Sequence, residues 1–264
     1  MPAGELQRIW LVYCAMHMAG APVPVSAKSQ GPRPRPEAEE IYRRWIRFLD
    51  EEFTRHRSPE RRSEIVRDQL YQIYLGRPYE GRRAVTLTTE LPGDVLSLSL
   101  DPENVTLEAE QFGDADEALF AVRKPLLWFW QMFDRSPIGV NLWLGIRLRC
   151  MLGRHIFRHM GTGVKIYPGV DLTYGYNLSI GDGAIIRKGA LLNDRGGITI
   201  GKGALIGSFA RVFSHSYSVG DYEHLTLHHT TIGDNARVAS HSIVLAGQDV
   251  PPGGVVGSFP ADRV

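Results

Sequence analysis

A six-residue period dominates the C-terminal part of the chain, most clearly in GITIGKGALIGSFARVFSHS at residues 197–216. The pairs Ile200-Gly201, Ile206-Gly207 and Val212-Phe213 each begin one hexad. Neither the 3.6-residue period of a helix nor the alternation of an ordinary strand fits this pattern. A short fixed period with small corner residues predicts a β-solenoid, in which stacked short strands bury one continuous core.

The period extends over residues 162–261 and is interrupted twice. The register slips by two residues at 194–197, breaks at 216–231, and returns at Ile232. Before the slip, the second hexad position is held by Gly163, Gly169, Gly175 and Gly181. We interpret the repeat as a scaffold and the break as a loop beside a functional site.

The first half of the chain has a different period, and the 28 glycines concentrate after Gly161. Apolar residues at helical spacing predict a helix that starts near Glu37. Ser58 followed by Pro59 predicts the N-terminus of a second helix, because serine caps and proline favours the first helical position. A further helix is predicted over residues 114–124.

Between these helices the period changes again. Apolar and polar residues alternate at 95–100, a turn-forming stretch follows, and Val105-Thr106-Leu107 resumes the pattern, which predicts a small β-hairpin. We therefore expect three parts. They are an N-terminal segment with a Pro/Arg linker at 1–35, a mainly α-helical region with the hairpin at 36–152, and the solenoid domain at 153–264.

Two apolar stretches raise the question of a membrane. Residues 9–27 resemble a weak signal peptide, but Glu5 and His17 favour an ordinary N-terminal segment. Residues 125–152 are rich in tryptophan, yet Asp134 interrupts them and each apolar run is too short to span a bilayer. We predict a packing bridge between the two halves, with peripheral membrane contact as the alternative.

Composition excludes several classes of protein. The 264 residues have a net charge of +1, which gives no case for a nucleic-acid partner. The two cysteines, Cys14 and Cys150, make neither a disulfide framework nor a metal cluster. A reducing cytoplasm is the simplest location for such a chain.

Several segments carry a resemblance to a known family. NDRGGITIGKGALIG, the following FSHS, TIGDNARVASHS and the ending DVPPGGVVGSFPADRV resemble the hexapeptide-repeat acyltransferases, in the branch of sugar and xenobiotic O-acetyltransferases. The resemblance covers the C-terminal two-fifths of the chain. It implies a left-handed parallel β-helix with three hexads per coil, and so about five coils here. It also implies acetyl-CoA as acyl donor, a sugar or glycoconjugate hydroxyl as acceptor, and a homotrimer with its sites between subunits.

The resemblance makes His215 the catalytic residue, because it stands directly before the break as the family's histidine does. Transfer of an acyl group to a hydroxyl needs a base with a pKa near neutrality, and histidine fits. The alternative is a histidine that caps a strand end. Where the family often has a second histidine, this chain has Tyr217, which we assign to the acceptor site.

Further site residues also follow from the resemblance. Asn193 and Asp194 are expected to bind the acceptor or to orient His215, although both also suit a plain turn. The pantetheine arm of the coenzyme is expected to pass small residues, and its phosphates to meet a cation. These positions are Ser240, Ala246 and Gly247 for the arm, with Arg237 and Arg263 as the nearest cations.

Two other functions remain open on the same fold. The gamma-class carbonic anhydrases bind zinc through histidines, and this chain has His224, His228, His229 and His241. They lie on or near the break rather than on successive coil corners, so we expect no metal. The third hypothesis is a non-catalytic module whose solenoid serves as an assembly surface.

Overall fold

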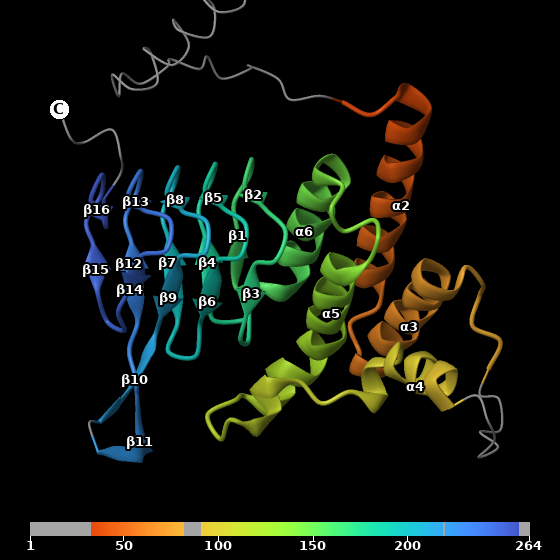
Figure 1. The fold of residues 1–264 in the computed structure, drawn as a ribbon, viewed down its shortest axis with the longest axis horizontal. Coiled ribbons are helices and arrows are strands. Elements are labelled where there is room, and N and C mark those ends of the chain that lie inside the picture. The colour runs from red at the N-terminus through yellow and green to blue at the C-terminus, as the bar shows by residue number, and fades with distance from the viewer. Residues whose placement is uncertain (1–32, 82–90, 219, 259–264) are drawn as a thin grey trace, which may run out of the picture. The chain divides into compact units, whose positions relative to one another are not determined.

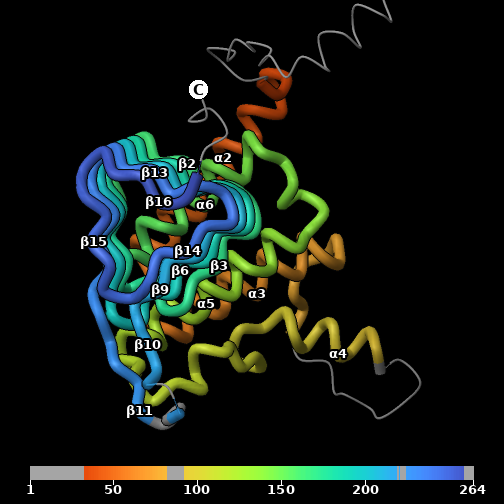
Figure 2. Tube along the Cα trace, turned by 60° about the vertical axis from the view of Figure 1, so that its left-hand side comes forward, coloured from red at the N-terminus to blue at the C-terminus, as the bar shows by residue number. Residues whose placement is uncertain are grey.

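The computed structural model describes residues 33–81, 91–218 and 220–258. The predicted N-terminal segment up to residue 32 and Arg263 lie outside these residues. The C-terminal part is a parallel β-helix whose coils stack along one axis (Figures 1 and 2). The β-solenoid predicted from the hexads is therefore confirmed, as is the left-handed β-helix that the family resemblance implied.

Three parallel sheets form the sides of the β-helix. The first contains β1 (His159–Met160), β4 (Leu178–Ile180), β7 (Ile198–Ile200), β12 (Thr230–Ile232) and β15 (Asp249–Val250). The second contains β2 (Lys165–Ile166), β5 (Ile185–Ile186), β8 (Leu205–Ile206), β13 (Arg237–Val238) and β16 (Val255–Val256). The third contains β3 (Asp171–Leu172), β6 (Leu191–Asn193), β9 (Arg211–Phe213) and β14 (Ile243–Val244). Four complete coils and two strands of a fifth agree with the expected number.

The hexad pattern places aliphatic side chains of successive strands inside the β-helix. Ile166, Ile186, Ile206 and Val238 stack along one sheet, each with at most 1% of its surface exposed. A column of this kind buries apolar surface without a gap, at about 25 cal/mol per Å². The corners need glycine because neighbouring coils touch there. A Cβ on Gly181 would lie 2.7 Å from the backbone nitrogen of Lys202.

The coils are not uniform in length. Leu178 pairs with Ile198, so an early coil advances by 20 residues, whereas Thr231 pairs with Asp249, an advance of 18. The break predicted at residues 216–231 adds further residues to its coil. It is an antiparallel hairpin of β10 (His215–Ser218) and β11 (Asp221–Leu227), and the chain rejoins the sheet at Thr230. The loop predicted at 216–231 is thus a hairpin that starts at His215 and ends before β12.

The preceding region is helical, as predicted. Its elements are α2 (Pro36–Arg55), α3 (Pro59–Leu75), α4 (Leu91–Ser99), the short 3-10 helices η1 (Pro102–Asn104) and η2 (Glu108–Gln111), α5 (Glu117–Arg135) and α6 (Leu142–Ile156). Ser58 caps α3 by accepting a hydrogen bond from the Arg61 backbone N–H at 3.3 Å. Among the helices that the structure describes, none is both long and apolar enough to cross a membrane.

The predicted β-hairpin at 95–107 is wrong, because this segment forms α4 and η1 instead. The alternating leucines do not share one buried face: Leu100 is buried, whereas Leu96 and Leu98 are exposed. The backbone N–H of Leu100 donates to the carbonyl of Leu96, four residues earlier, as in a helix. Asp101 then caps η1 by accepting from the Glu103 N–H at 3.1 Å. Local helical bonds therefore override the alternation.

The tryptophan-rich stretch bridges the two halves, as predicted. It forms the C-terminal half of α5 and most of α6, and both pack on the first coil. The indole N–H of Trp130 donates to the carbonyl of Val170 at 2.9 Å, and the Asp134 carboxylate accepts from the Gly169 N–H at 2.7 Å. Helix α6 runs through the expected boundary after residue 152, and the three-part division remains a prediction.

Candidate active site

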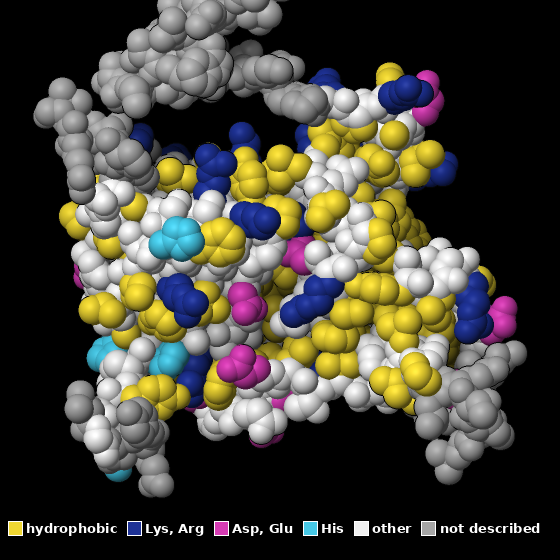
Figure 3. All heavy atoms as spheres, in the orientation of Figure 1, with side chains coloured by type: hydrophobic (Ala, Val, Ile, Leu, Met, Phe, Trp, Pro, Cys, Tyr) yellow, Lys and Arg dark blue, Asp and Glu magenta, His cyan; other side chains and the backbone are white. Residues whose placement is uncertain are grey.

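A cavity of about 630 Å³ lies between the outer face of the β3–β6–β9 sheet and the helical region. His215, Asn193 and Tyr217 line it from the β-helix side. Residues 106–109 and one face of α5 line it from the helical side. On the face shown in Figure 3, acidic side chains lie between the β-helix and the helices, with basic side chains on either side. The cavity therefore presents both charges beside a histidine.

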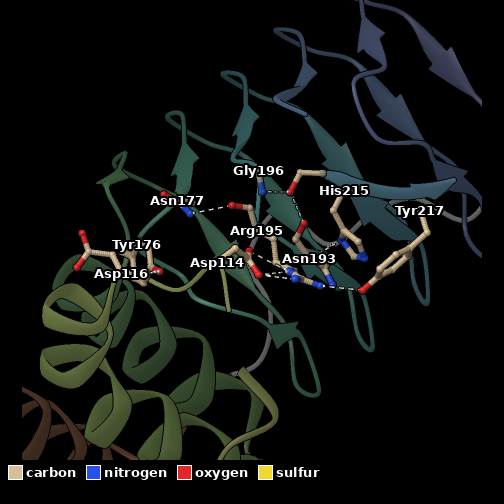
Figure 4. Close-up of polar contacts among 10 residues, drawn as sticks. Asp114, Asp116, Tyr176, Asn177, Asn193, Arg195, Gly196, His215 and Tyr217 are labelled. Atoms are coloured by element: carbon tan, nitrogen blue, oxygen red, sulfur yellow. Dashed lines mark hydrogen bonds and ion pairs between the residues drawn. The ribbon is translucent and has the colours of Figure 1, made fainter. Parts of the chain in front are cut away.

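The imidazole of His215 is held at one nitrogen and open at the other. Its Nδ1 lies 3.0 Å from the amide Oδ1 of Asn193 (Figure 4). An amide oxygen only accepts, so Nδ1 carries the proton and Nε2 is left as the basic nitrogen. Within the described part of the chain, Nε2 has no hydrogen-bond partner. The predicted orientation of His215 by this corner is thus supplied by Asn193.

The backbone beneath His215 is fixed by its buried neighbour Ser214. The Ser214 hydroxyl donates to the carbonyl of Asn193 at 2.6 Å and accepts from the Gly196 N–H at 2.9 Å. The slip at residues 194–197 and the start of the hairpin are therefore joined by one side chain. This joint sets the separation between Asn193 and His215 before any substrate arrives.

An ion pair that the sequence did not predict lies beside this histidine. The guanidinium of Arg195 is bonded to the Asp114 carboxylate, with Nε 3.0 Å from Oδ2, and lies 4.1 Å from the ring centre of Phe112. It also donates to the Tyr217 hydroxyl at 3.2 Å. The Tyr217 ring meets the His215 ring edge-on, with 5.5 Å between their centres. Asp114, from the helical region, is thereby connected to the catalytic candidate.

These charges act on the ionisation of the site. Burial lowers the pKa of His215 below its ordinary 6.5, and the positive charge of Arg195 lowers it further, whereas Asp114 opposes the shift. Burial alone would raise the pKa of Asp114, but its bonds with Arg195 leave it below the usual range. Because its pKa is lowered, the His215 imidazole is neutral at neutral pH, which is the form that can accept a proton.

Asp194 lies away from His215, unlike its neighbour Asn193. Its carboxylate is fully buried and accepts from the backbone N–H groups of Tyr174 at 2.8 Å and Asn177 at 3.1 Å. Burial raises its pKa, and these N–H groups oppose the rise. These contacts make Asp194 a support for the preceding coil, and they leave no surface for the acceptor that we expected it to bind.

The predicted coenzyme residues fall on two corners of the fourth coil. Gly247 lies beside the hairpin, since its N–H donates to the Thr230 hydroxyl at 3.0 Å and a Cβ there would meet His228. Ala246 precedes it in the same turn. Ser240 lies at the other corner and Arg237 on the preceding strand β13, and both are exposed. The structure thus brings Ala246 and Gly247, but not Arg237, near the base of the hairpin.

The histidines considered for zinc do not form one site. His228 contacts the Ser216 hydroxyl at 3.1 Å, His229 contacts the Thr199 hydroxyl at 2.9 Å, and His241 stacks on Phe209. Among the described residues, no three His, Cys, Asp or Glu side chains are placed to hold a metal ion. A zinc ion needs such a convergent set.

Comparison with known proteins gives the family. No family model matches the chain. A "Putative acetyltransferase" of Dictyostelium discoideum is 34% identical over 92 residues, which are 33% of this chain and 48% of that protein. The "Putative colanic acid biosynthesis acetyltransferase WcaF" of Escherichia coli K12 is 31% identical over 144 residues, which are 52% of this chain and 75% of that protein. The chain belongs to the hexapeptide-repeat acetyltransferase family.

Solved structures with a similar fold include a hexapeptide-repeat-containing acetyltransferase of Vibrio cholerae, at 24% identity and a TM-score of 0.42, covering 59% of this chain and 90% of that one. A maltose O-acetyltransferase of Clostridium difficile follows at 17% identity and a TM-score of 0.41, covering 53% and 83%. As a hexapeptide-repeat acetyltransferase, the chain carries its candidate base at the start of the hairpin. The sequence did not predict the ion pair of Arg195 and Asp114, because 81 positions separate the two residues and no local pattern connects them.

Proposed function

We propose that this protein transfers an acetyl group from acetyl-CoA to a hydroxyl of a sugar or glycoconjugate precursor, with His215 as general base. The observation that carries the proposal is the state of the imidazole. Asn193 holds the proton on Nδ1, and the free Nε2 belongs to a residue that lines the cavity. A base with this tautomer and a pKa below 6.5 is ready to accept a proton at neutral pH.

The reaction needs one proton transfer in each direction. Nε2 of His215 takes the proton of the acceptor hydroxyl as its oxygen attacks the thioester carbon. The carbon–sulfur bond then breaks, and the imidazolium returns the proton to the leaving thiolate, which gives coenzyme A and the O-acetyl product. The Asn193 amide keeps the ring oriented through both steps, since it accepts from the Nδ1 proton throughout.

The donor side of the site remains the one expected from the family resemblance. Ala246 and Gly247 offer a close backbone approach next to the hairpin, with Ser240 and Arg237 further along the coil. Exposed aliphatic side chains on the outside of the late coils support a homotrimer with these residues in its groove, since apolar surface of this kind favours burial between subunits. They are Ile243, Leu245 and Val255. We place the reaction in the cytoplasm, where Cys150 would stay a free thiol.

The proposal is tested by release of coenzyme A thiol from acetyl-CoA with a panel of sugars and small alcohols. We expect His215→Ala to lower the rate by about 10²–10⁴-fold, the usual contribution of a general base. His159→Ala is the matched control, because His159 is exposed on β1 and does not line the cavity. Full activity of His215→Ala would refute the assignment of the base. Failure of the wild-type protein to bind coenzyme A by calorimetry would favour the non-catalytic module.

A further inference from the structure

One face of α5 lines the cavity opposite His215. Trp128, Gln131 and Arg135 are all lining residues, and their spacing of three and four places them on one side of the helix. They come from the helical region of the same chain, not from a neighbouring β-helix. This wall of the cavity therefore comes from the same chain as His215.

Two residues of α5 that stand next to lining residues attach this wall to the β-helix. Trp130 and Asp134 bond the carbonyl of Val170 and the N–H of Gly169 in the first coil, at 2.9 and 2.7 Å. Each of these two residues directly precedes a lining residue, Gln131 or Arg135. The side chains that face the cavity are thus held at a set distance from the sheet that carries His215.

Besides Arg195, which is paired with Asp114, the cavity is lined by two arginines and two carboxylates that form no ion pair among the described residues. Arg135 on α5 and Arg211 on β9 lie on opposite walls, and in the described part of the chain neither forms an ion pair. Glu108 and Asp171 also line the cavity without a cation partner in the same residues. They are close enough to act on each other: partial burial and Glu108 raise the pKa of Asp171, and Arg135 lowers it.

A ligand of either charge would meet a like charge in this cavity. An anionic ligand would meet Glu108 and Asp171, and a cationic ligand would meet Arg135 and Arg211. A hydroxyl both donates to a carboxylate and accepts from a guanidinium, so a ring with several hydroxyls can satisfy both at once. The half-buried rings of Trp128 and Phe213 add apolar surface for the C–H face of such a ring.

We propose that α5 supplies half of the acceptor site in the same subunit, and that Gln131 and Arg135 select a neutral, polyhydroxylated ring as the acceptor. This inference rests on the proposed acetyl transfer for the chemistry of the acceptor. It adds the location of the site and the charge of the ligand. Gln131 and Arg135 are specificity-determining residues, since they contact the acceptor remote from the proton that His215 removes.

The test measures acceptor KM with the full-length protein, acetyl-CoA and the methyl glycosides of glucose, galactose and mannose. We expect Arg135→Gln to raise the KM of the best neutral glycoside by about 10-fold or more, the loss of one charge-assisted hydrogen bond. Gln131→Ala should raise it by about 5-fold. Arg47→Gln is the matched control, since Arg47 is an exposed arginine of α2 outside the cavity and without an ion pair among the described residues.

The same assay is repeated with the glucuronic acid and glucosamine analogues of the best glycoside, which should both be poorer acceptors. A charged analogue with the higher kcat/KM, or an unchanged KM in Arg135→Gln, would overturn the inference and leave the proposed function in place. Saturation-transfer NMR with the neutral glycosides detects binding without turnover. If no neutral glycoside binds while coenzyme A does, the inference fails alone; if coenzyme A does not bind either, the proposed function fails with it.

Discussion

Two buried arginine–aspartate pairs tie the molecule together, and only one of them belongs to the active site. Arg149 pairs with Asp134 inside the helical region, and Arg195 pairs with Asp114 between the helical region and the β-helix. The two arginine side chains have 0% and 5% of their surface exposed. By burial and partner type alone they cannot be told apart.

Their surroundings separate them. Arg149 donates to Asp134 and to the carbonyl of Gly139, and it packs against Gly145, where a Cβ would lie 2.6 Å from Nη1. All of these groups belong to α5, α6 and their connection. Arg195 extends instead to the hydroxyl of Tyr217, whose ring touches His215. A buried ion pair therefore marks a functional site only where it leads to a titratable group that is open to a cavity.

The largest expected effect is the loss of stability when the Arg149–Asp134 pair is broken. Arg149→Gln leaves the Asp134 carboxylate buried without its cation, which should lower the free energy of unfolding by about 3–5 kcal/mol. Urea unfolding measures this change. The folded fraction should keep the wild-type kcat, since neither residue lines the cavity and the Asp134 carboxylate, which the variant retains, can still accept from the Gly169 N–H that holds α5 on the first coil. A fall in kcat at unchanged stability would show that the Arg149–Asp134 pair also acts on catalysis.

The second largest expected effect is on kcat, and it distinguishes the Arg195–Asp114 pair from the Arg149–Asp134 pair. Arg195→Gln removes the anchor of Tyr217 and the charge beside His215, and we expect kcat to fall by about 10–100-fold, or about 1.4–2.7 kcal/mol of barrier. Tyr217→Phe keeps the ring contact but loses the hydroxyl, so its kcat should fall less. Thiol release under saturating acetyl-CoA measures both. Equal kcat values for Arg195→Gln and the wild type would place Arg195 with Arg149 as a purely structural residue.

The same contrast explains what the sequence could predict. The β-helix follows from a local period that is visible in consecutive residues, and His215 follows from the family resemblance of the segment that ends where this period breaks. Asn193 was predicted, together with Asp194, because the resemblance implies polar groups at this corner of the coil. Asp194, its neighbour, has an identical sequence context, but its side chain turns into the coil interior. The direction of a corner side chain depends on the next coil, which no local pattern contains.

The helical region was harder to predict than the β-helix for a related reason. Helix α3 begins where its serine cap predicts it, but Asp114, Gln131 and Arg135 gain their roles only by packing against distant coils. The false hairpin at 95–107 has a different cause, because local helical hydrogen bonds such as that from the Leu100 N–H to the Leu96 carbonyl override the alternation. Solenoid contacts repeat at a fixed spacing, and the contacts of the helical region do not.

The smallest expected effect is a shift in pH dependence, and it is the most specific to one pair. His215 must be neutral to accept a proton, so activity is present above its pKa and lost as the pH falls through it. Burial and Arg195 hold that pKa below 6.5, so wild-type activity should persist below pH 6.5. Arg195→Gln should move the acid limb of kcat/KM to higher pH, and Asp114→Asn should move it to lower pH, because Asp114 raises the pKa of His215. Arg149→Gln should leave the limb in place, since its charge has no part in the shift. Opposite shifts for the two partners of one pair, with none for the other pair, cannot arise from a general loss of stability.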